Sequence, residues 1–298
     1  MSDPHTVIVL GSSPESYFIG HGRRHYVENM SESFTNHAKD TLNVSMTTWA
    51  SVSKDLETWV TYDVATDKFH FNGSIHQDIR DHLSGTNGKS LTDFVAFPDS
   101  DDPGCYFSNG KSQGAWNAFL DQKIIDKLNE VKAGIDDFDQ GIKGMIFGKG
   151  KTFILMFHAG FVAELDDEEF TDEEHPLIKV LRDHSEGWCI ERGSTLCFYD
   201  SKYFFLKFKK PGTSQTMMHW NLPIGMAEKL QDLQETAKQP EELMAIMESD
   251  QMWMKLAQSR MNMQLNMSTM MAQQMHRGGL AMLAAVTGGT VVEKPYYS

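Results

Sequence analysis

The pentapeptide FVAEL, Phe161 to Leu165, contains a junction between a strand and a helix that recurs along the chain. Aromatic residues stand 45 positions apart three times in succession, at Tyr26, Phe71, Trp116 and Phe161. Four positions after each aromatic comes a large apolar residue, namely Met30, Ile75, Leu120 and Leu165. A fifth pair, Trp220 and Ile224, follows after a longer step of 59 residues. The spacing predicts five repeats, in each of which a strand ends near the aromatic and a helix or turn begins near the apolar residue.

The residues between these junctions predict three or four strands and one short helix in each repeat. In the second repeat, three β-rich runs precede SIHQDIRDHL, in which Ile75, Ile79 and Leu83 recur every four residues. That spacing puts them on one helical face, and Ser74 is positioned to cap the helix. We therefore expect a repeat domain over residues 1–235, with units at 6–38, 43–85, 92–133, 142–183 and 186–235.

Strand-rich units of this size cannot bury both faces alone, so they stack either radially as blades or linearly as a solenoid. Five copies favour a closed ring, and we expect a mainly β, propeller-like fold with short helices. The alternative is an α+β domain whose hairpins and helices repeat without closing a ring. The stretch SYFIGHGRRHY, Ser16 to Tyr26, resembles the middle strands of hemopexin-type blades. By pattern alone, this resemblance extends over residues 6–231 and implies blade-like packing.

The C-terminal residues change in character and predict one long helix over 236–277, followed by a flexible tail over 278–298. No Gly and no further Pro occur between Pro240 and Met275, and this segment holds ten of the 19 methionines. Methionine is flexible and polarizable, so such a helix suits self-association or capture of a protein partner. Membrane-surface contact and Cu(I) binding by thioethers are the alternatives. The candidate binding residues are Met254, Met261, Met263, Met270 and Met271.

The net charge of the chain limits the classes of molecule that it is expected to bind. The formal net charge is −14, and residues 236–298 contain five Lys/Arg and five Asp/Glu, so the excess lies in residues 1–235. An acidic body repels phosphate backbones, which argues against nucleic acid as a partner. The apolar runs near the N-terminus and at Leu280 to Val286 are too short for a signal peptide or a transmembrane helix. The three cysteines, Cys105, Cys189 and Cys197, fit a reducing compartment, so we expect a cytoplasmic protein, and we expect Cys189 and Cys197 to be small core residues.

Basic residues gather in GHGRRHY, Gly20 to Tyr26, within the acidic part of the chain. Strand alternation predicts Arg23 and His25 on one face, with Arg24 and Tyr26 on the other. The segment is either a tight turn with solvated cations or a site for an anion or acidic partner. Two histidines without a third ligand are too few for a metal site. The candidate binding residues are His21, Arg23, Arg24 and His25, and we expect no metal or cofactor.

Local motifs for catalysis are missing from the sequence. Gly88-Lys89-Ser90 resembles the end of a phosphate-binding loop, but the position that needs glycine is Leu83 and the segment follows a predicted helix. No Cys-x-x-Cys, His-Glu-x-x-His or Gly-x-Ser-x-Gly pattern occurs. The acidic runs DSDDP and DDEEFTDEEH lack the alternating ligands of a calcium loop.

These features favour a non-enzymatic binding or scaffold protein, with an acidic propeller-like body and a Met-rich helix for self-association or partner binding. One alternative is an enzyme with its active site at the mouth of the ring. Two or more titratable residues with perturbed pKa values in one pocket would distinguish it. Another alternative is an intracellular lectin-like carbohydrate binder, in which polar loop residues repeat once per unit.

Overall fold

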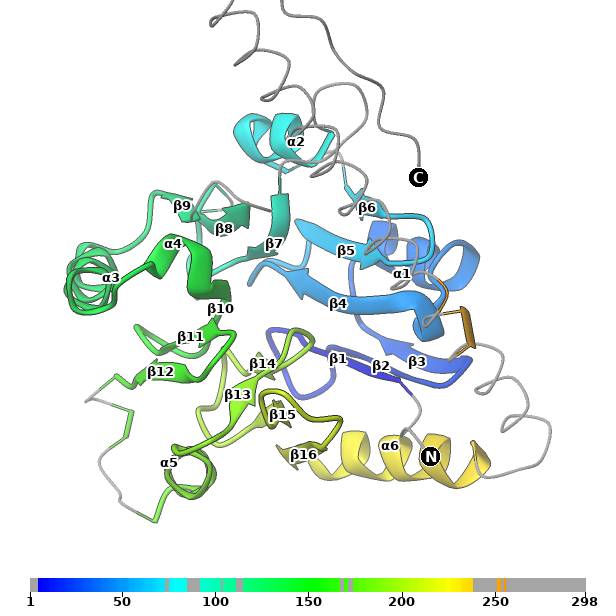
Figure 1. Cartoon of the computed structure of the whole chain (residues 1–298). Coiled ribbons are helices and arrows are strands. Elements are labelled where there is room, and N and C mark those ends of the chain that lie inside the picture. The colour runs from blue at the N-terminus through cyan, green and yellow to red at the C-terminus, as the bar shows by residue number, and fades with distance from the viewer. Residues whose placement is uncertain are drawn as a thin grey trace, which may run out of the picture. The chain divides into compact units, whose positions relative to one another are not determined.

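The computed structural model describes residues 5–72, 75–84, 92–102, 104–110, 115–166, 169–170, 174–237, 251–252 and 255. The chain divides into two units, Met1–Met247 and Glu248–Ser298. All helices and strands with labels in Figure 1 belong to the first unit, which is mainly β with several small antiparallel sheets and short helices.

Each of the first four sheets consists of three consecutive antiparallel strands. The first contains β1 (Thr6–Leu10), β2 (Tyr17–His21) and β3 (Arg24–Glu28), and the second contains β4 (Thr47–Val52), β5 (Trp59–Asp63) and β6 (Lys68–Phe71). The third contains β7 (Thr92–Ala96), β8 (Tyr106–Gly110) and β9 (Ala115–Ala118), and the fourth contains β10 (Ile142–Phe147), β11 (Phe153–Phe157) and β12 (Phe161–Glu164). In the fifth sheet, β15 (Phe204–Lys209) pairs with β13 (Cys189–Ile190), β14 (Thr195–Leu196) and β16 (Thr216–Asn221).

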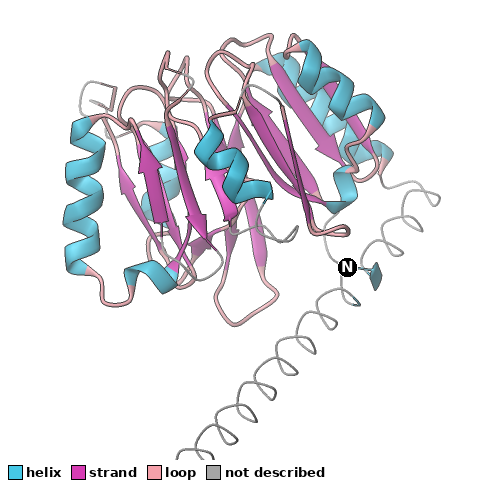
Figure 2. Ribbon diagram, turned by 90° about the horizontal axis from the view of Figure 1, so that it is seen from above, coloured by secondary structure: helices cyan, strands magenta, loops and turns pink. Residues whose placement is uncertain are grey.

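One helix follows the last strand of each sheet. These helices are α1 (Glu32–Asp40), α2 (Gln77–Ser84), α3 (Gln122–Gly134), α5 (Pro176–Asp183) and α6 (Ile224–Thr236). The short η1 (Val44–Met46) and α4 (Phe138–Gly141) precede β4 and β10. Local chemistry sets the helix starts, because Asp121 caps α3 by accepting from the Lys123 N–H and Pro176 occupies the first turn of α5. In Figure 2 the helices flank the strands, and the predicted order of strands followed by one helix holds in all five segments.

The four aromatic residues with the 45-residue spacing, and the fifth at Trp220, all lie on the last strand in sequence of their sheets, but not at equivalent positions. Phe161 begins β12, whereas Phe71 ends β6. The expected apolar anchors also differ, because Met30, Ile75 and Leu120 are buried while Ile224 is 80% exposed. The constant spacing therefore reflects the repeated order of elements rather than one repeated contact. The aromatic residues occupy different positions along their strands because the hairpins differ in length, with two residues between β2 and β3 and four between β5 and β6.

Both faces of the first sheet are buried, as the apolar content predicts. Alternate side chains along a strand point to opposite faces. One face packs on α1 and the second sheet, through Val7, Val9, Phe18, Phe34 and Trp59. The other face packs on the fifth sheet and α6, through Ile8, Leu10, Ile19, Phe205, Met226, Leu230 and Leu233.

The first strands of the first four sheets and β14 of the fifth contact one another near the middle of the first unit (Figure 1). Strand β1 lies beside β4 and β14, and β10 lies beside β7 and β14. Strand β4 also contacts β7, so these contacts connect each sheet with the next in the chain. Hydrogen bonding among the described strands leaves five separate sheets and does not join them into a closed barrel.

Several predictions concern residues that the structure does not describe. The phosphate-loop-like segment at Gly88 to Ser90 is one of them, and so is the tail over 278–298. Of the predicted Met-rich helix, only residues 236–237, 251–252 and 255 are described. The candidate residues Met254, Met261, Met263, Met270 and Met271 therefore lie outside the described residues. Among the helices that are described, none combines the length and apolarity needed to cross a bilayer.

Candidate functional site

Charged and polar side chains gather where the first strands of the five sheets begin. We call this set the central cluster, and it consists of His5, Asp93, Lys143, Glu191, Arg192 and Lys207. His5 precedes β1, Asp93 lies in β7 and Lys143 lies in β10, while Glu191, Arg192 and Lys207 belong to the fifth sheet and the loop between β13 and β14. The second sheet contributes a backbone carbonyl from Thr47. Each of the five sheets therefore supplies a polar group.

Arg192 joins three sheets through its guanidinium. Its Nε donates to the carbonyl oxygen of Lys143 at 2.9 Å, and its terminal nitrogen pairs with Asp93 Oδ2 at 2.5 Å. The guanidinium carbon also lies 5.8 Å from the ring centroid of Phe94. These contacts hold the β13–β14 loop against β7 and β10, and they use two of the five N–H donors of the guanidinium.

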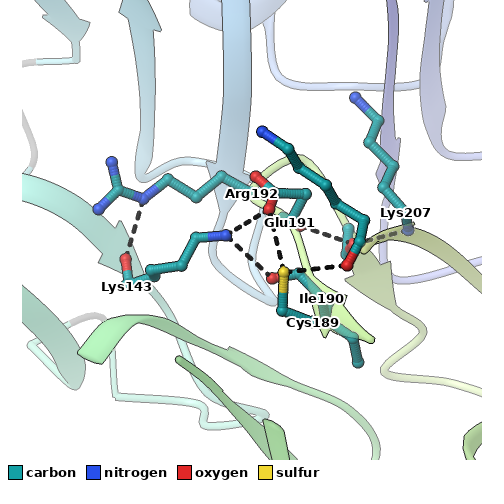
Figure 3. A network of polar contacts seen from close by, with 8 residues as sticks. Lys143, Cys189, Ile190, Glu191, Arg192 and Lys207 are labelled. Atoms are coloured by element: carbon teal, nitrogen blue, oxygen red, sulfur yellow. Dashed lines mark hydrogen bonds and ion pairs between the residues drawn. The ribbon is translucent and has the colours of Figure 1, made fainter. Parts of the chain in front are cut away.

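Lys143 and Glu191 form a second pair beside it (Figure 3). The Lys143 Nζ atom lies 2.6 Å from Glu191 Oε1, and the lysine side chain is only 10% exposed. The Cys189 thiol donates to the same carboxylate at 3.4 Å and to the Lys209 carbonyl at 3.2 Å. Burial raises the pKa of Cys189, so this thiol stays protonated at neutral pH. The buried thiol is therefore not an activated nucleophile, and it agrees with the predicted core role of the cysteines.

Lys207 differs from the other two cations because its ammonium group forms no ion pair with any residue that the structure describes. Figure 3 shows its side chain directed away from the Lys143–Glu191 pair. Among the described residues, no carboxylate or carbonyl lies within hydrogen-bond distance of its Nζ, and the nearest aromatic ring, Phe205, is 5.9 Å away. Burial lowers the pKa of Lys207 to about 8, against an opposing effect of the Glu191 charge. The residue as a whole is nevertheless partly exposed to solvent.

His5 is the neutral member of the central cluster. Its Nε2 faces the carbonyl oxygen of Thr47, and since a carbonyl only accepts, Nε2 carries the proton. Burial, together with the charge of Lys207, lowers the pKa of His5 to about 3. At neutral pH, His5 therefore adds a hydrogen-bonding group and no charge. Three cations and two carboxylates remain in the cluster.

A cavity of about 30 Å³ lies toward the other end of these strands, lined by the ends of β1, β4, β7 and β10 and by residues 193–195, and none of the six cluster side chains is part of its lining. It has room for about one or two water molecules. Gly193 is both part of this lining and a neighbour of Lys207. Its φ angle is +83°, and a Cβ atom here would lie 2.7 Å from the Thr48 carbonyl oxygen and 3.0 Å from Lys207 Nζ. Glycine is needed at this position because the backbone is left-handed and the space is filled.

The basic segment singled out in the sequence does not form a single group of side chains. His21 ends β2, is buried and is hydrogen-bonded with Thr6 Oγ1 at 2.8 Å, whereas Arg23 and Arg24 are exposed at the turn. His25 faces Phe18, with ring centroids 5.6 Å apart. Tyr26 points to the other face, where its hydroxyl reaches α6, so the predicted alternation is confirmed for these two residues. A binding role for His21, Arg23, Arg24 and His25 stays a prediction.

Sequence reasoning missed the central cluster because its members come from distant segments. The available signal was weak but regular, since polar residues occur at or just before the start of the first strand of each unit. Examples are Thr47, Asp93 and Lys143. Among the described residues, no group of three His, Cys, Asp or Glu side chains is arranged to hold a metal ion. Comparison with known families, curated proteins and solved structures finds no match to this chain.

Proposed function

We propose that this is a non-enzymatic binding protein whose five sheets form a propeller-like ring and whose central cluster binds a small anion. The observation that carries the proposal is the ammonium of Lys207, which has no partner among the described residues, whereas the neighbouring charged groups are paired. A partly buried charge without a partner costs several kcal/mol, and such a cost is typical of functional sites. A carboxylate, sulfate or phosphate oxygen would complete the hydrogen bonding of this ammonium.

The contacts of the first strands support the ring. The order of contacts runs from β1 to β4, β7, β10 and β14, and β14 contacts β1 again. Helix α6, which follows the fifth sheet, packs on β2 and β3 of the first. In a ring, the first strands surround a common axis, and that arrangement brings residues from five separate units into one site.

The size and charge of the surroundings limit the ligand. Space beside the Lys207 ammonium is limited, because a Cβ atom at Gly193 would lie 3.0 Å from Nζ. The net charge of −14 repels polyanions by long-range electrostatics, whereas a single small anion is attracted only at close range by Lys207. Inorganic oxyanions and short carboxylates therefore fit best. Self-association or capture of a protein partner through residues 236–277 remains a separate part of the proposal.

Isothermal titration with sulfate and acetate at neutral pH tests the anion site. We expect Lys207→Met to weaken binding by about tenfold or more, which corresponds to at least ~1.4 kcal/mol. The matched control is Lys202→Met, because Lys202 is an exposed lysine of the same repeat. Circular dichroism establishes that both variants are folded. Equal affinity in the wild type and Lys207→Met, or no binding at millimolar anion, would contradict the proposal.

One observation favours the enzyme as a second candidate. Lys207 and His5 interact electrostatically, and both have lowered pKa values, about 8 and about 3. An amine with a pKa near 8 is partly unprotonated at neutral pH and can attack a carbonyl carbon to form an imine with loss of water. Borohydride reduction in the presence of small aldehydes and keto acids, followed by peptide mass spectrometry, tests this candidate. A reduced adduct on Lys207 and not on Lys202 would support an enzyme over a simple binding protein.

A further inference from the structure

Two imidazoles and a thioether meet on the outer part of the fifth sheet, apart from the central cluster. Met217 and His219 are two residues apart on β16, so their side chains share one face of the strand. The His219 Nε2 atom lies 2.9 Å from Met217 Sδ. His184 directly follows α5, and its ring centroid lies 4.5 Å from that of His219, with the rings inclined by 60°. We name this set the His-Met cluster.

We propose that the His-Met cluster binds one soft monovalent metal ion, Cu(I) in the cell, through His184, His219 and Met217. Thioether and imidazole are ligands that suit Cu(I), and soft donors select it over hard divalent cations. The proposal is independent of the anion site.

The two imidazoles are prepared for coordination. His184 Nδ1 lies 2.9 Å from the Val180 carbonyl oxygen, and because a carbonyl only accepts, Nδ1 carries the proton. Nε2 is therefore the nitrogen of His184 that is available to a metal ion, as in metal sites where a backbone carbonyl fixes the other ring nitrogen. His219 is positioned by its strand, because its Nε2 atom already lies 2.9 Å from the Met217 sulfur.

The spacing of the donor atoms also fits. With bond lengths of ~2.0 Å to nitrogen and ~2.3 Å to sulfur, tetrahedral geometry separates the two donors by roughly 3.5 Å. The observed separation of His219 Nε2 and Met217 Sδ is 2.9 Å, so only a small side-chain movement opens the site. Two imidazoles at 4.5 Å between centroids can likewise face one ion.

Aromatic rings form the walls of the cluster. Phe208 stacks on His184 at 4.5 Å, and Trp188 lies edge-on to the same ring at 5.6 Å. Phe161 packs against Phe208 at 6.1 Å. Such surroundings limit water and favour a monovalent ion, whose hydration is weaker than that of a divalent one. Met217 is 37% exposed and gives an entry path.

The test uses the full chain and Ag(I) as a redox-inert substitute for Cu(I). The ¹⁵N-labelled protein is titrated with Ag(I), and the imidazole resonances are recorded in the wild type, Met217→Leu, His219→Gln and Met218→Leu. Met218 is the matched control because it is the next residue on β16 and packs into the core on the opposite face. Competition with a chromophoric Cu(I) chelator gives the affinity. The ten methionines of residues 240–275 do not confuse the result, because the imidazole signals locate the ion.

We expect one equivalent of Ag(I) bound at this cluster to shift the ring nitrogens of both His184 and His219. Met217→Leu and His219→Gln should each weaken the site by about tenfold or more, and Met218→Leu should leave it unchanged. Imidazole signals of His184 and His219 that do not move with Ag(I) would overturn the proposal. Equal weakening by Met217→Leu and Met218→Leu would overturn it as well, because the loss would then come from packing.

Discussion

The hydroxyl group of Tyr26 donates a hydrogen bond of 2.7 Å to Asp232 Oδ2, across 206 positions of sequence. The ammonium of Lys229 lies 4.4 Å from the centroid of the same tyrosine ring. This contact joins β3 of the first sheet to α6, the helix after the last sheet. Beneath it, Met226, Leu230 and Leu233 of α6 pack against the first sheet. The last repeat therefore packs on the first.

Leu230→Ala tests whether this packing stabilises the whole first unit. Leu230 is 1% exposed, so its truncation should lower the free energy of unfolding by about 2 to 5 kcal/mol. Ile224→Ala is the control in the same helix, because Ile224 is 80% exposed and should change stability by less than about 0.5 kcal/mol. Chemical denaturation measures both. A small effect of Leu230→Ala would mean that α6 is not part of the cooperative core.

Trp49→Ala tests the contact between the second and third sheets. Trp49 is 1% exposed, and its ring centroid lies 4.7 Å from that of Phe94 in β7. We expect a loss of about 3 to 5 kcal/mol in the free energy of unfolding. Trp220, the aromatic residue of the fifth repeat, is 40% exposed, and Trp220→Ala should lower the free energy of unfolding by clearly less. Similar losses in the free energy of unfolding for the two variants would contradict the difference in burial between Trp49 and Trp220.

Gly193→Ala tests the close packing around Lys207. The new Cβ atom meets the Thr48 carbonyl oxygen and the Lys207 ammonium, in addition to the strain of a positive φ angle. Gly187→Ala is the matched control, because Gly187 has a φ angle of +73° and open space around its Cβ position. Both variants should lose about 1 kcal/mol from strain, and Gly193→Ala should lose more and also weaken anion binding. If the two variants unfold at the same denaturant concentration, the close contacts at Gly193 do not contribute to the free energy of unfolding.

Lys207→Met should stabilise the protein while it removes anion binding. The pKa of Lys207 is lowered to about 8 in the folded state, from 10.5. The unfolded chain therefore binds this proton more tightly than the folded protein does. The lowered pKa reduces the free energy of unfolding by its full amount below pH 8, and this reduction disappears as the pH rises to 10.5. At pH 7, the variant should gain on the order of 1 to 3 kcal/mol. Thermal denaturation at pH 7 and pH 10 checks this, and a gain that does not shrink at pH 10 would refute the assigned cause.

Local patterns predicted the order of elements better than they predicted the site. Ile79 and Leu83 have helical spacing and are buried in α2, as expected, and the alternation of His25 and Tyr26 is also found. The prediction that the aromatic residues occupy equivalent positions in the repeats was wrong, because hairpins of different length place each aromatic at a different point along its strand. Asp93 and Lys143 carry only the weak signal of lying near the start of a strand, and Arg192 and Lys207 carry none, since only contacts between separate sheets bring these residues together. The cluster of His184 and His219 escaped notice for the same reason.

The pH dependence of sulfate binding tests the anion site most directly. Sulfate keeps its charge between pH 6 and pH 10, and His5, with a pKa of about 3, does not titrate in this range. Protonation of Lys207 should then control the affinity. We predict a constant Kd below about pH 7.5 and a weakening that approaches tenfold per pH unit above pH 8 in the wild type and in Lys202→Met. A Kd that stays constant up to pH 10, or an unchanged profile in Lys207→Met, would contradict the account.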